Sequence, residues 1–240
     1  MSTGPHAPLS NMALCQELML KARNRASHLP GIVVMHGHSG FGKSTAASWV
    51  TVEENGVYVE VRSVWTTRHF LEQIVRMLGF EPERTQARLL DQVVAGLTDN
   101  KRPLIIDEAD FILKKSYIEV VRDIYEMARV PVMLIGEEHL PSALRKWERF
   151  HNRILALAHA RAATVEDGLT LRKYYCKRVD IADDLVAHIV RETGGGIRRI
   201  VTNLAEVEDA ALNDGRSSMD LATWGDRRIF TGSPDYTKGA

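Results

Sequence analysis

The sequence predicts an α/β fold, in which a parallel sheet with crossover helices is followed by a smaller helical region. The first observation is that short apolar runs alternate with helical patterns as far as about residue 160, which is typical of a parallel sheet. The second is a glycine-rich segment directly after the first apolar run. The third is that only helical patterns follow residue 160.

Each element of the larger region is predicted from local signals. Residues 1–10, with Pro5 and Pro8, predict a flexible N-terminus, and Asn11 is the expected N-cap of an amphipathic helix that reaches Ala26. Apolar runs predict strands, and the periodic segments between them predict helices. The expected strands are 31–36, 57–62, 103–107 and 131–135, and the expected helices are 43–54, 67–78, 85–97 and 115–128.

The helical region has its own start and stop signals. Thr164 and Asp167 have the spacing of a capping box, and Gly194 to Gly196 separate the last two helices. The expected helices are 164–177, 181–193 and 197–213. The expected domains are a flexible N-terminus (1–10), an α/β core (11–160), a helical lid (161–214) and a flexible or partner-binding tail (215–240).

Composition limits the class of protein. Apolar residues make up 45% and charged residues 26%, as in ordinary globular domains. The 31 basic residues balance 31 acidic ones, so global charge neither supports nor excludes a nucleic-acid partner. Cys15 and Cys176 lack a paired spacing, which argues against a zinc site or a disulfide framework and fits the reducing cytoplasm. No apolar run approaches about 18 residues, so no membrane partner is expected.

One glycine-rich segment fits the phosphate-binding pattern G-x-x-x-x-G-K-[ST], known as the P-loop. Backbone NH groups of such a loop and the start of the following helix attract phosphate. Lys43 is expected to pair with the β- and γ-phosphates of ATP, and Ser44 is expected to hold Mg²⁺. The expected nucleotide-binding residues are Gly37, His38, Ser39, Gly40, Phe41, Gly42, Lys43, Ser44 and Thr45.

A second nucleotide motif ends the third expected strand. The apolar run before Asp107 delivers that carboxylate to the edge of the sheet where ligands bind. Asp107 is expected to hold Mg²⁺, and Glu108 is expected to polarise the attacking water. With Ala109 and Asp110 these residues also spell the box of one RNA helicase group, but such helicases need two tandem α/β domains, and this chain has room for one.

Over residues 11–213 these motifs together resemble the AAA+ ATPases. The resemblance implies a P-loop core, a C-terminal helical lid, and ATP and Mg²⁺ as cofactors. Arg149, in a segment similar to the family's Ser-Arg-Phe box, is implied to act on the ATP of a neighbouring subunit. The alternative is a basic helix face with Arg145 and Arg153. Arg198, in a segment similar to the lid motif Gly-Asp-x-Arg, is implied to reach the phosphates, with a structural salt bridge as the alternative.

A narrower resemblance rests on residues 130–140, which are similar to a Leu-x-Gly-x-x-x-Leu segment of one AAA+ subset. This subset includes the phage Mu B protein, TnsC and the ExeA-type ATPases. Glu137 departs from the Asn, Ser or Thr that senses the γ-phosphate in the family, and a carboxylate there would repel phosphate. No membrane span or added DNA-binding domain is expected, which leaves a compact Mu B/TnsC-like ATPase. The resemblance implies a homo-oligomeric ring or helical filament that binds DNA with ATP and recruits a transposase for target selection.

Binding to double-stranded DNA without sequence preference requires local basic residues that contact phosphates. The candidates follow the C-terminal ends of expected strands, and each could instead be a solvated surface residue. They are Thr67 and Arg68 after the second strand, and Lys114 and Lys115 after the acidic motif.

Two other functions share the P-loop. A helicase loader similar to IstB and DnaC would have the same core and a replicative helicase as its partner. A small-molecule kinase would transfer the phosphoryl group to a metabolite, but the helical lid and the arginine box argue against it.

Overall fold

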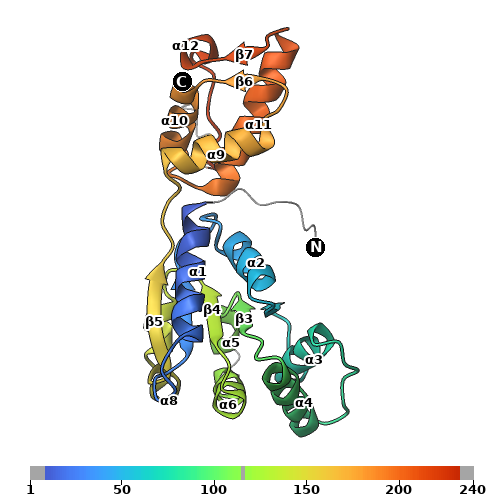
Figure 1. Ribbon diagram of the computed structural model, residues 1–240. Coiled ribbons are helices and arrows are strands. Elements are labelled where there is room, and N and C mark those ends of the chain that lie inside the picture. Colours follow the sequence, from blue (N-terminus) through green and yellow to red (C-terminus); the bar gives the residue numbers. More distant parts are fainter. Residues whose placement is uncertain (1–8, 115–116, 233–240) are drawn as a thin grey trace, which may run out of the picture. The chain divides into compact units, whose positions relative to one another are not determined.

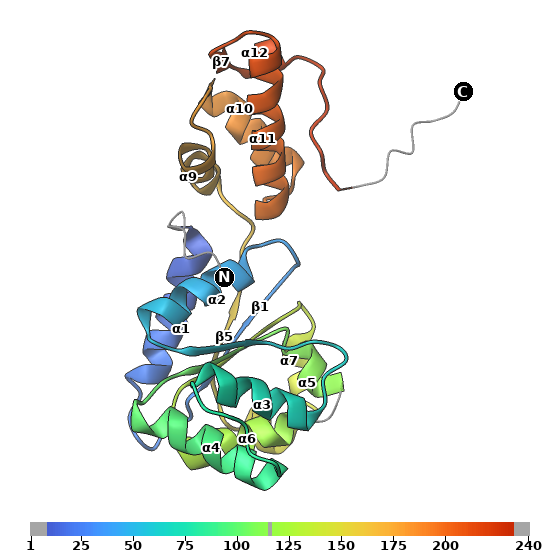
Figure 2. The same cartoon turned by 90° about the vertical axis from the view of Figure 1, so that its right-hand side faces the viewer.

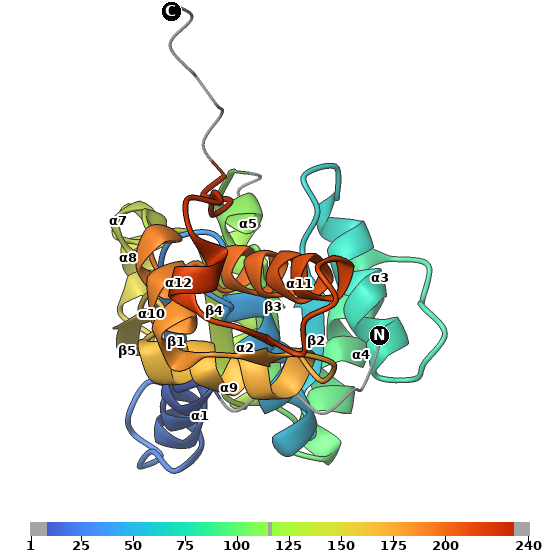
Figure 3. The same ribbon diagram turned by 90° about the horizontal axis from the view of Figure 1, so that it is seen from above.

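The computed structural model describes residues 9–114 and 117–232, which divide into two compact units. The core unit comprises residues 11–38 and 43–160, and the helical unit comprises residues 39–42, those before Asn11 and those after Ala160. Both are shown in Figure 1 and, from two further directions, in Figures 2 and 3. Each unit has a hydrophobic core of its own.

A five-stranded parallel sheet forms the centre of the core unit, which confirms the predicted fold class. The strand order is β2-β3-β4-β1-β5, so β1 lies between β4 and β5, and Ile32 pairs with both Val132 and Ile154. The strands are β1 (Ile32–His36), β2 (Val57–Glu60), β3 (Leu104–Asp107), β4 (Val132–Gly136) and β5 (Ile154–His159). Four of them match the predicted strands to within two residues at each end.

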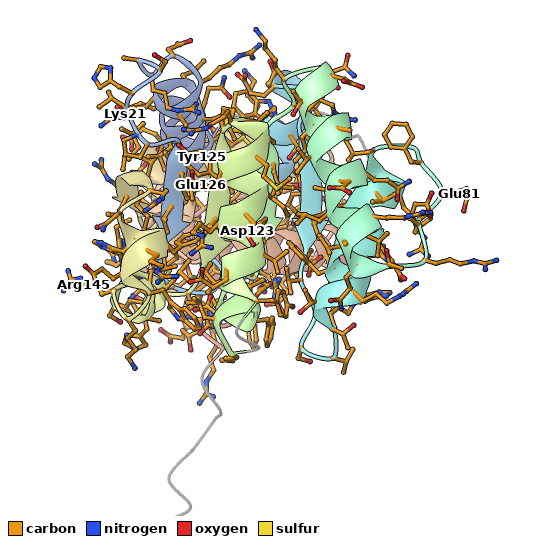
Figure 4. The ribbon with its side chains drawn as sticks, turned by 90° about the horizontal axis from the view of Figure 1, so that it is seen from below. Lys21, Glu81, Asp123, Tyr125, Glu126 and Arg145 are labelled. Atoms are coloured by element: carbon orange, nitrogen blue, oxygen red, sulfur yellow. The ribbon has the colours of Figure 1, made fainter. Side chains whose placement is uncertain are left out.

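Helices pack on both faces of this sheet. Alternate strand residues such as Ile106 and Leu134 join the core formed with α3, α4 and α6, whereas Met133 faces the other side and contacts Cys15 of α1. Figure 4 views the unit from the N-terminal ends of the strands, with α6 marked by Asp123 and Tyr125. The helices are α1 (Ser10–Arg23), α2 (Lys43–Glu53), α3 (Thr67–Met77), α4 (Gln86–Asp99), α5 (Asp110–Lys114), α6 (Ile118–Ala128), α7 (Leu140–Leu144) and α8 (Glu148–His151).

The core unit differs from the prediction in several places: the short helices α5 and α7 were not expected, and α1 ends at Arg23 before the predicted Ala26. Strand β5 was not expected, because it lies at the edge of the sheet and none of its residues is fully buried, so its sequence lacks a continuous apolar run. Asn11 is not an N-cap: α1 begins at Ser10, and Asn11 is buried inside the helix.

The helical unit contains the three predicted helices, with boundaries within two residues of those expected. Thr164 accepts a hydrogen bond from the Asp167 backbone, and the Asp167 side chain accepts one from the Thr164 backbone, which confirms the capping box. A two-stranded parallel sheet joins the loop before α10 to the segment after α11. The elements are α9 (Val165–Tyr175), β6 (Asp180–Ile181), α10 (Asp183–Glu192), α11 (Ile197–Asn213), β7 (Ser218–Met219) and α12 (Leu221–Trp224).

The segment from residue 215 to 232, expected as part of a flexible or partner-binding tail, packs on the helical unit. Met219 and Trp224 are buried in its core. Further along, the buried Asn203 side chain of α11 binds the backbone of Phe230, with its Nδ2 donating to the carbonyl and its Oδ1 accepting from the NH. The regular elements of this segment are only two and four residues long, which is why apolar periodicity did not predict it.

Across the two described stretches of the chain, no helix is long and apolar enough to cross a membrane.

Candidate nucleotide-binding site

The predicted P-loop connects β1 to α2. Strand β1 ends at His36 and α2 begins at Lys43, which gives the strand–loop–helix order that the motif requires. Gly40 has a φ of 87° and Gly42 a φ of 79°, and L-residues with a Cβ rarely adopt such left-handed angles. The two glycines therefore allow a turn in which the backbone can approach a phosphate closely.

Lys43 turns back over the start of the loop. Its Nζ donates to the carbonyl oxygens of Gly37 at 2.7 Å and His38 at 2.8 Å. Partial burial lowers the pKa of Lys43, while the charges of nearby carboxylates, Asp107 first and Glu108 next, act in the opposite direction. The P-loop lysine thus lies within range of the charges of both residues of the acidic motif.

Asp107 is buried at the end of β3 and accepts two hydrogen bonds within its own unit. The Tyr58 hydroxyl donates to Oδ2 at 2.7 Å, and the Glu108 backbone NH donates to Oδ1 at 2.8 Å. Each carboxylate oxygen has a second lone pair, so the group can still accept from water or bind a cation. The role of Tyr58 is not readable from the sequence, because it depends on β2 pairing with β3.

Glu108 has an unusual backbone. Its φ of 56° is in the left-handed region, which is uncommon for residues other than glycine and is enriched at functional sites. Partial burial raises the pKa of Glu108, and the neighbouring charges of Asp107, Asp110 and Glu137 raise it further. A carboxyl group with a raised pKa at a strand end can accept a proton or orient water.

Asp110 is a further residue that the sequence motif did not single out. Its Oδ2 accepts a hydrogen bond from the Glu137 backbone NH at 2.8 Å. A Cβ added at Gly136 would lie 2.3 Å from that same oxygen, so a side chain at the end of β4 would displace the Asp110 carboxylate. Asp110 therefore fixes the turn after β4, and the exposed Glu137 enters this arrangement through its backbone.

Three histidines cluster at the start of the loop. The rings of His36 and His159 are 5.0 Å apart, edge to face, and those of His38 and His159 are 6.4 Å apart. His38 Nε2 is 3.3 Å from Glu138 Oε1. Burial lowers the pKa of His36, and His159 lowers it further. These contacts tie the second residue of the P-loop to the turn after β4.

The residues that would hold Mg²⁺ have suitable chemistry. Ser44 offers an exposed hydroxyl at the start of α2, and Asp107 offers a carboxylate with free lone pairs. Mg²⁺ prefers oxygen ligands and usually binds through one or two protein groups plus phosphates and water. The donor set therefore fits this ion.

Arg149 lies at the N-terminal ends of the parallel strands, whereas Lys43 lies at their C-terminal ends. It is in α8, just before the N-terminal end of β5, whereas Lys43 follows the C-terminal end of the parallel strand β1. Among the described residues its side chain has no hydrogen-bond or ion-pair partner. Arg153, by contrast, binds Glu126 Oε1 at 2.6 Å, and Figure 4 shows this edge, with Arg145 and Glu126 labelled. Because α7 and α8 are separate short helices, the three arginines do not form one helix face.

Arg198 is exposed in the first turn of α11. In the same unit, the Ile197 NH donates to the Gly40 carbonyl at 2.9 Å. The neighbouring Arg199 is also exposed. No ion pair of Arg198 occurs in the described chain, so the salt-bridge alternative gains no support.

The candidate DNA-binding residues differ in their surroundings. Arg68 Nε is 2.7 Å from Glu72 Oε1, and its guanidinium also donates to the Arg84 carbonyl. Thr67 begins α3. Lys114 is exposed, with its Nζ 5.1 Å from the Phe111 ring centroid. Lys115 lies outside the described residues. Arg68 thus makes an ion pair and a hydrogen bond within the protein, whereas Lys114 contacts only an aromatic ring among the described residues.

The fold and the site together define a P-loop NTPase of the AAA+ class. The sheet order, the P-loop after β1, and the acidic pair at the end of β3 carry this conclusion. The sequence profile of the AAA domain family matches residues 25–144. The chain therefore belongs to the AAA domain family.

Solved structures support the same fold. The Aeropyrum pernix ORC2 protein in its ADP form has a TM-score of 0.69 at 16% identity over 91% of this chain and 67% of its own. The Aeropyrum pernix ORC1 protein in complex with DNA gives 0.65 at 15% identity, over 90% and 63% respectively. The Thermotoga maritima RuvB Holliday junction branch migration motor gives 0.55 at 17% identity, over 94% and 67%.

These likenesses establish the fold alone, and this chain spans about two thirds of the length of each relative. No curated protein matches the sequence.

Proposed function

We propose that this protein is an ATPase that binds double-stranded DNA when ATP is bound, assembles with further copies of itself, and recruits a transposase for target selection. The observation that carries the ATPase part is that the P-loop lysine Lys43, bonded to the Gly37 and His38 carbonyls, also feels the charges of Asp107 and Glu108 at the end of β3. The solved ADP form of ORC2 is consistent with a nucleotide ligand for this fold.

In the proposed reaction, the P-loop backbone and Lys43 bind the phosphates of ATP. Lys43 exchanges its two carbonyl partners for phosphate oxygens, which bear more negative charge. Glu108 orients a water molecule toward the γ-phosphate, and its raised pKa suits it to accept a proton. Ser44 and Asp107 would hold Mg²⁺, which supplies charge neutralisation on the phosphates when bound.

Arg149 is proposed to act in trans. Arg149 lies at the N-terminal ends of the strands and Lys43 at their C-terminal ends. Arg149 therefore does not contact the nucleotide bound by its own core unit. A second copy would bring Arg149 to that nucleotide, where a guanidinium stabilises transition-state charge. Assembly would then control hydrolysis. Arg198, on the proposed lid of residues 161–214, would place a second positively charged guanidinium at the phosphates.

The DNA-binding part rests on different support. Lys114 is exposed at the end of α5, at the edge of the sheet where the strands end, and Lys115 follows it in sequence. The structurally similar Aeropyrum pernix ORC1 protein was solved in complex with DNA. In an oligomer, one or two lysines from each copy add up along the duplex. The transposase as partner rests on the resemblance of residues 130–140 to the Mu B and TnsC proteins.

The test is binding to a fluorescent duplex of random sequence, measured by anisotropy with ATP or ADP. The wild type is expected to bind with ATP and to release the duplex with ADP. Lys43→Ala should lose ATP-dependent binding, and Glu108→Gln should bind ATP and remain on DNA. The control is Lys146→Ala. Lys146 is an exposed lysine just before α8, away from the C-terminal strand ends where the P-loop lies.

Equal DNA binding by Lys43→Ala and the wild type would refute ATP control of DNA binding. Co-purification with a replicative helicase in place of a transposase would instead favour the helicase-loader function.

A further inference from the structure

Tyr58 lies on β2, outside both nucleotide motifs, yet its hydroxyl points at the acidic motif. The donor–acceptor distance to Asp107 Oδ2 is 2.7 Å. Tyr58 is 7% exposed and Asp107 is 2% exposed, so water competes little for this bond. The contact is long-range in sequence and depends on the pairing of β2 with β3, in which Tyr58 stands beside Ile105.

A second side chain lies near the hydroxyl. It belongs to Ser48 on α2. Ser48 lies four residues after Ser44, and residues with this spacing share one face of a helix. The Tyr58 hydroxyl therefore bonds to the strand that carries Asp107 and lies near the helix that carries the P-loop serine.

The Tyr58 hydroxyl is the donor in this bond, because the carboxylate oxygen of Asp107 accepts. Since the Glu108 NH occupies one lone pair of Oδ1 and Tyr58 occupies one of Oδ2, the carboxylate plane of Asp107 is fixed by two donors. The remaining lone pairs are then held in one orientation.

We propose that Tyr58 is a positioning residue for Mg²⁺: its hydroxyl orients the Asp107 carboxylate so that the free lone pairs face the ion held with Ser44. This inference rests on the proposed function as an ATPase. Hydrogen bonds from groups behind a metal ligand typically change metal affinity by about 10- to 100-fold.

The chain offers a matched control. Tyr117 is also a buried tyrosine of the core unit, at 3% exposure, and its ring packs on Phe70 with centroids 5.5 Å apart. Its hydroxyl has no hydrogen-bond partner within the described part of the chain. Tyr117→Phe therefore removes the same atom from a similar environment without touching Asp107.

The experiment measures binding of a fluorescent ATP analogue to the full chain as Mg²⁺ is titrated. Tyr58→Phe is expected to raise the Mg²⁺ concentration at half-saturation about tenfold, with the affinity for the analogue in a Mg²⁺ chelator unchanged. Tyr117→Phe should leave both quantities as in the wild type. Equal midpoints for Tyr58→Phe and Tyr117→Phe would overturn the proposal.

A double-mutant cycle separates positioning from a general loss of structure. In an Asp107→Asn background, Tyr58→Phe should have no further effect on the Mg²⁺ midpoint, because the ligand that it orients is already altered. An undiminished tenfold effect in that background would contradict the mechanism. Mg²⁺-independent binding by the wild type would overturn the magnesium part of the proposed function, whereas a normal wild type with a normal Tyr58→Phe overturns only the role of Tyr58.

Discussion

Replacing Asn203 with alanine should release the end of the helical unit from α11. Asn203 is 1% exposed, and its Nδ2 donates to the Phe230 carbonyl at 2.9 Å while its Oδ1 accepts from the Phe230 NH at 2.7 Å. The two bonds pair both backbone groups of one residue, as a neighbouring strand would. Beyond these contacts, Phe230 itself is half exposed, so little apolar burial holds this position.

The magnitude follows from the two bonds lost to Phe230, since the third bond of Asn203, from Nδ2 to the Arg199 carbonyl, lies within α11. Each hydrogen bond contributes about 0.5–1.5 kcal/mol, so the pair contributes about 1–3 kcal/mol to closing the segment on α11. That free energy corresponds to a roughly 5- to 150-fold change in the opening equilibrium. The Phe230 amide should therefore exchange with solvent deuterium faster by about this factor.

The assay is hydrogen exchange resolved at the Phe230 amide, by NMR or by peptide mass spectrometry. The matched control is Thr202→Ala on the same helix, which removes only a bond from Thr202 Oγ1 to the Arg198 carbonyl within α11. Amides of the core unit should be unaffected in both variants. The reasoning would be refuted if Phe230 exchanged at the same rate in Asn203→Ala and Thr202→Ala.

Three further predictions concern other parts of the molecule. Backbone hydrogen bonds from Arg178 lower the pKa of Glu208 below its ordinary value of 4.5, so its stabilising effect is present above pH 4.5 and is lost as the pH falls through the lower, folded value. In Glu208→Gln, the free energy of unfolding should therefore fall less steeply as the pH is lowered below 4.5, as followed by circular dichroism. An unchanged pH dependence would count against this role. Burial raises the pKa of the Cys15 thiol to about 12 and that of Cys176 to about 11, so a thiol-reactive disulfide reagent at pH 7 should label neither quickly before denaturation; rapid labelling of buried Cys15 would show that α1 opens. Arg149→Ala should reduce assembly-stimulated ATP hydrolysis about 1,000-fold or more with ATP affinity unchanged, and a loss confined to ATP affinity would argue against action in trans.

Much of the fold could be predicted because its signals are local. Apolar runs such as residues 131–135 are buried on both faces, so they read as strands without any knowledge of their neighbours. The capping box of Thr164 and Asp167 spans only three residues. The P-loop is also a local signal, since strand, glycines, lysine and helix follow one another directly.

The parts that could not be predicted depend on contacts between distant segments. Strand β5 is only partly buried at the sheet edge, so its apolar pattern is weak. The bond from Tyr58 to Asp107 exists because β2 pairs with β3. The contact of Asp110 with the turn at Glu137 crosses 27 positions in the chain. Such roles become visible only when the topology is known.

The most direct test of the central claim is electron microscopy of the purified protein with random-sequence duplex DNA, in parallel samples with ATP and with ADP. The account predicts rings or filaments on the duplex with ATP, dissociated subunits with ADP, and no assembly of Lys43→Ala in either sample. Assemblies that form equally with both nucleotides, or subunits that never associate with DNA, would contradict it.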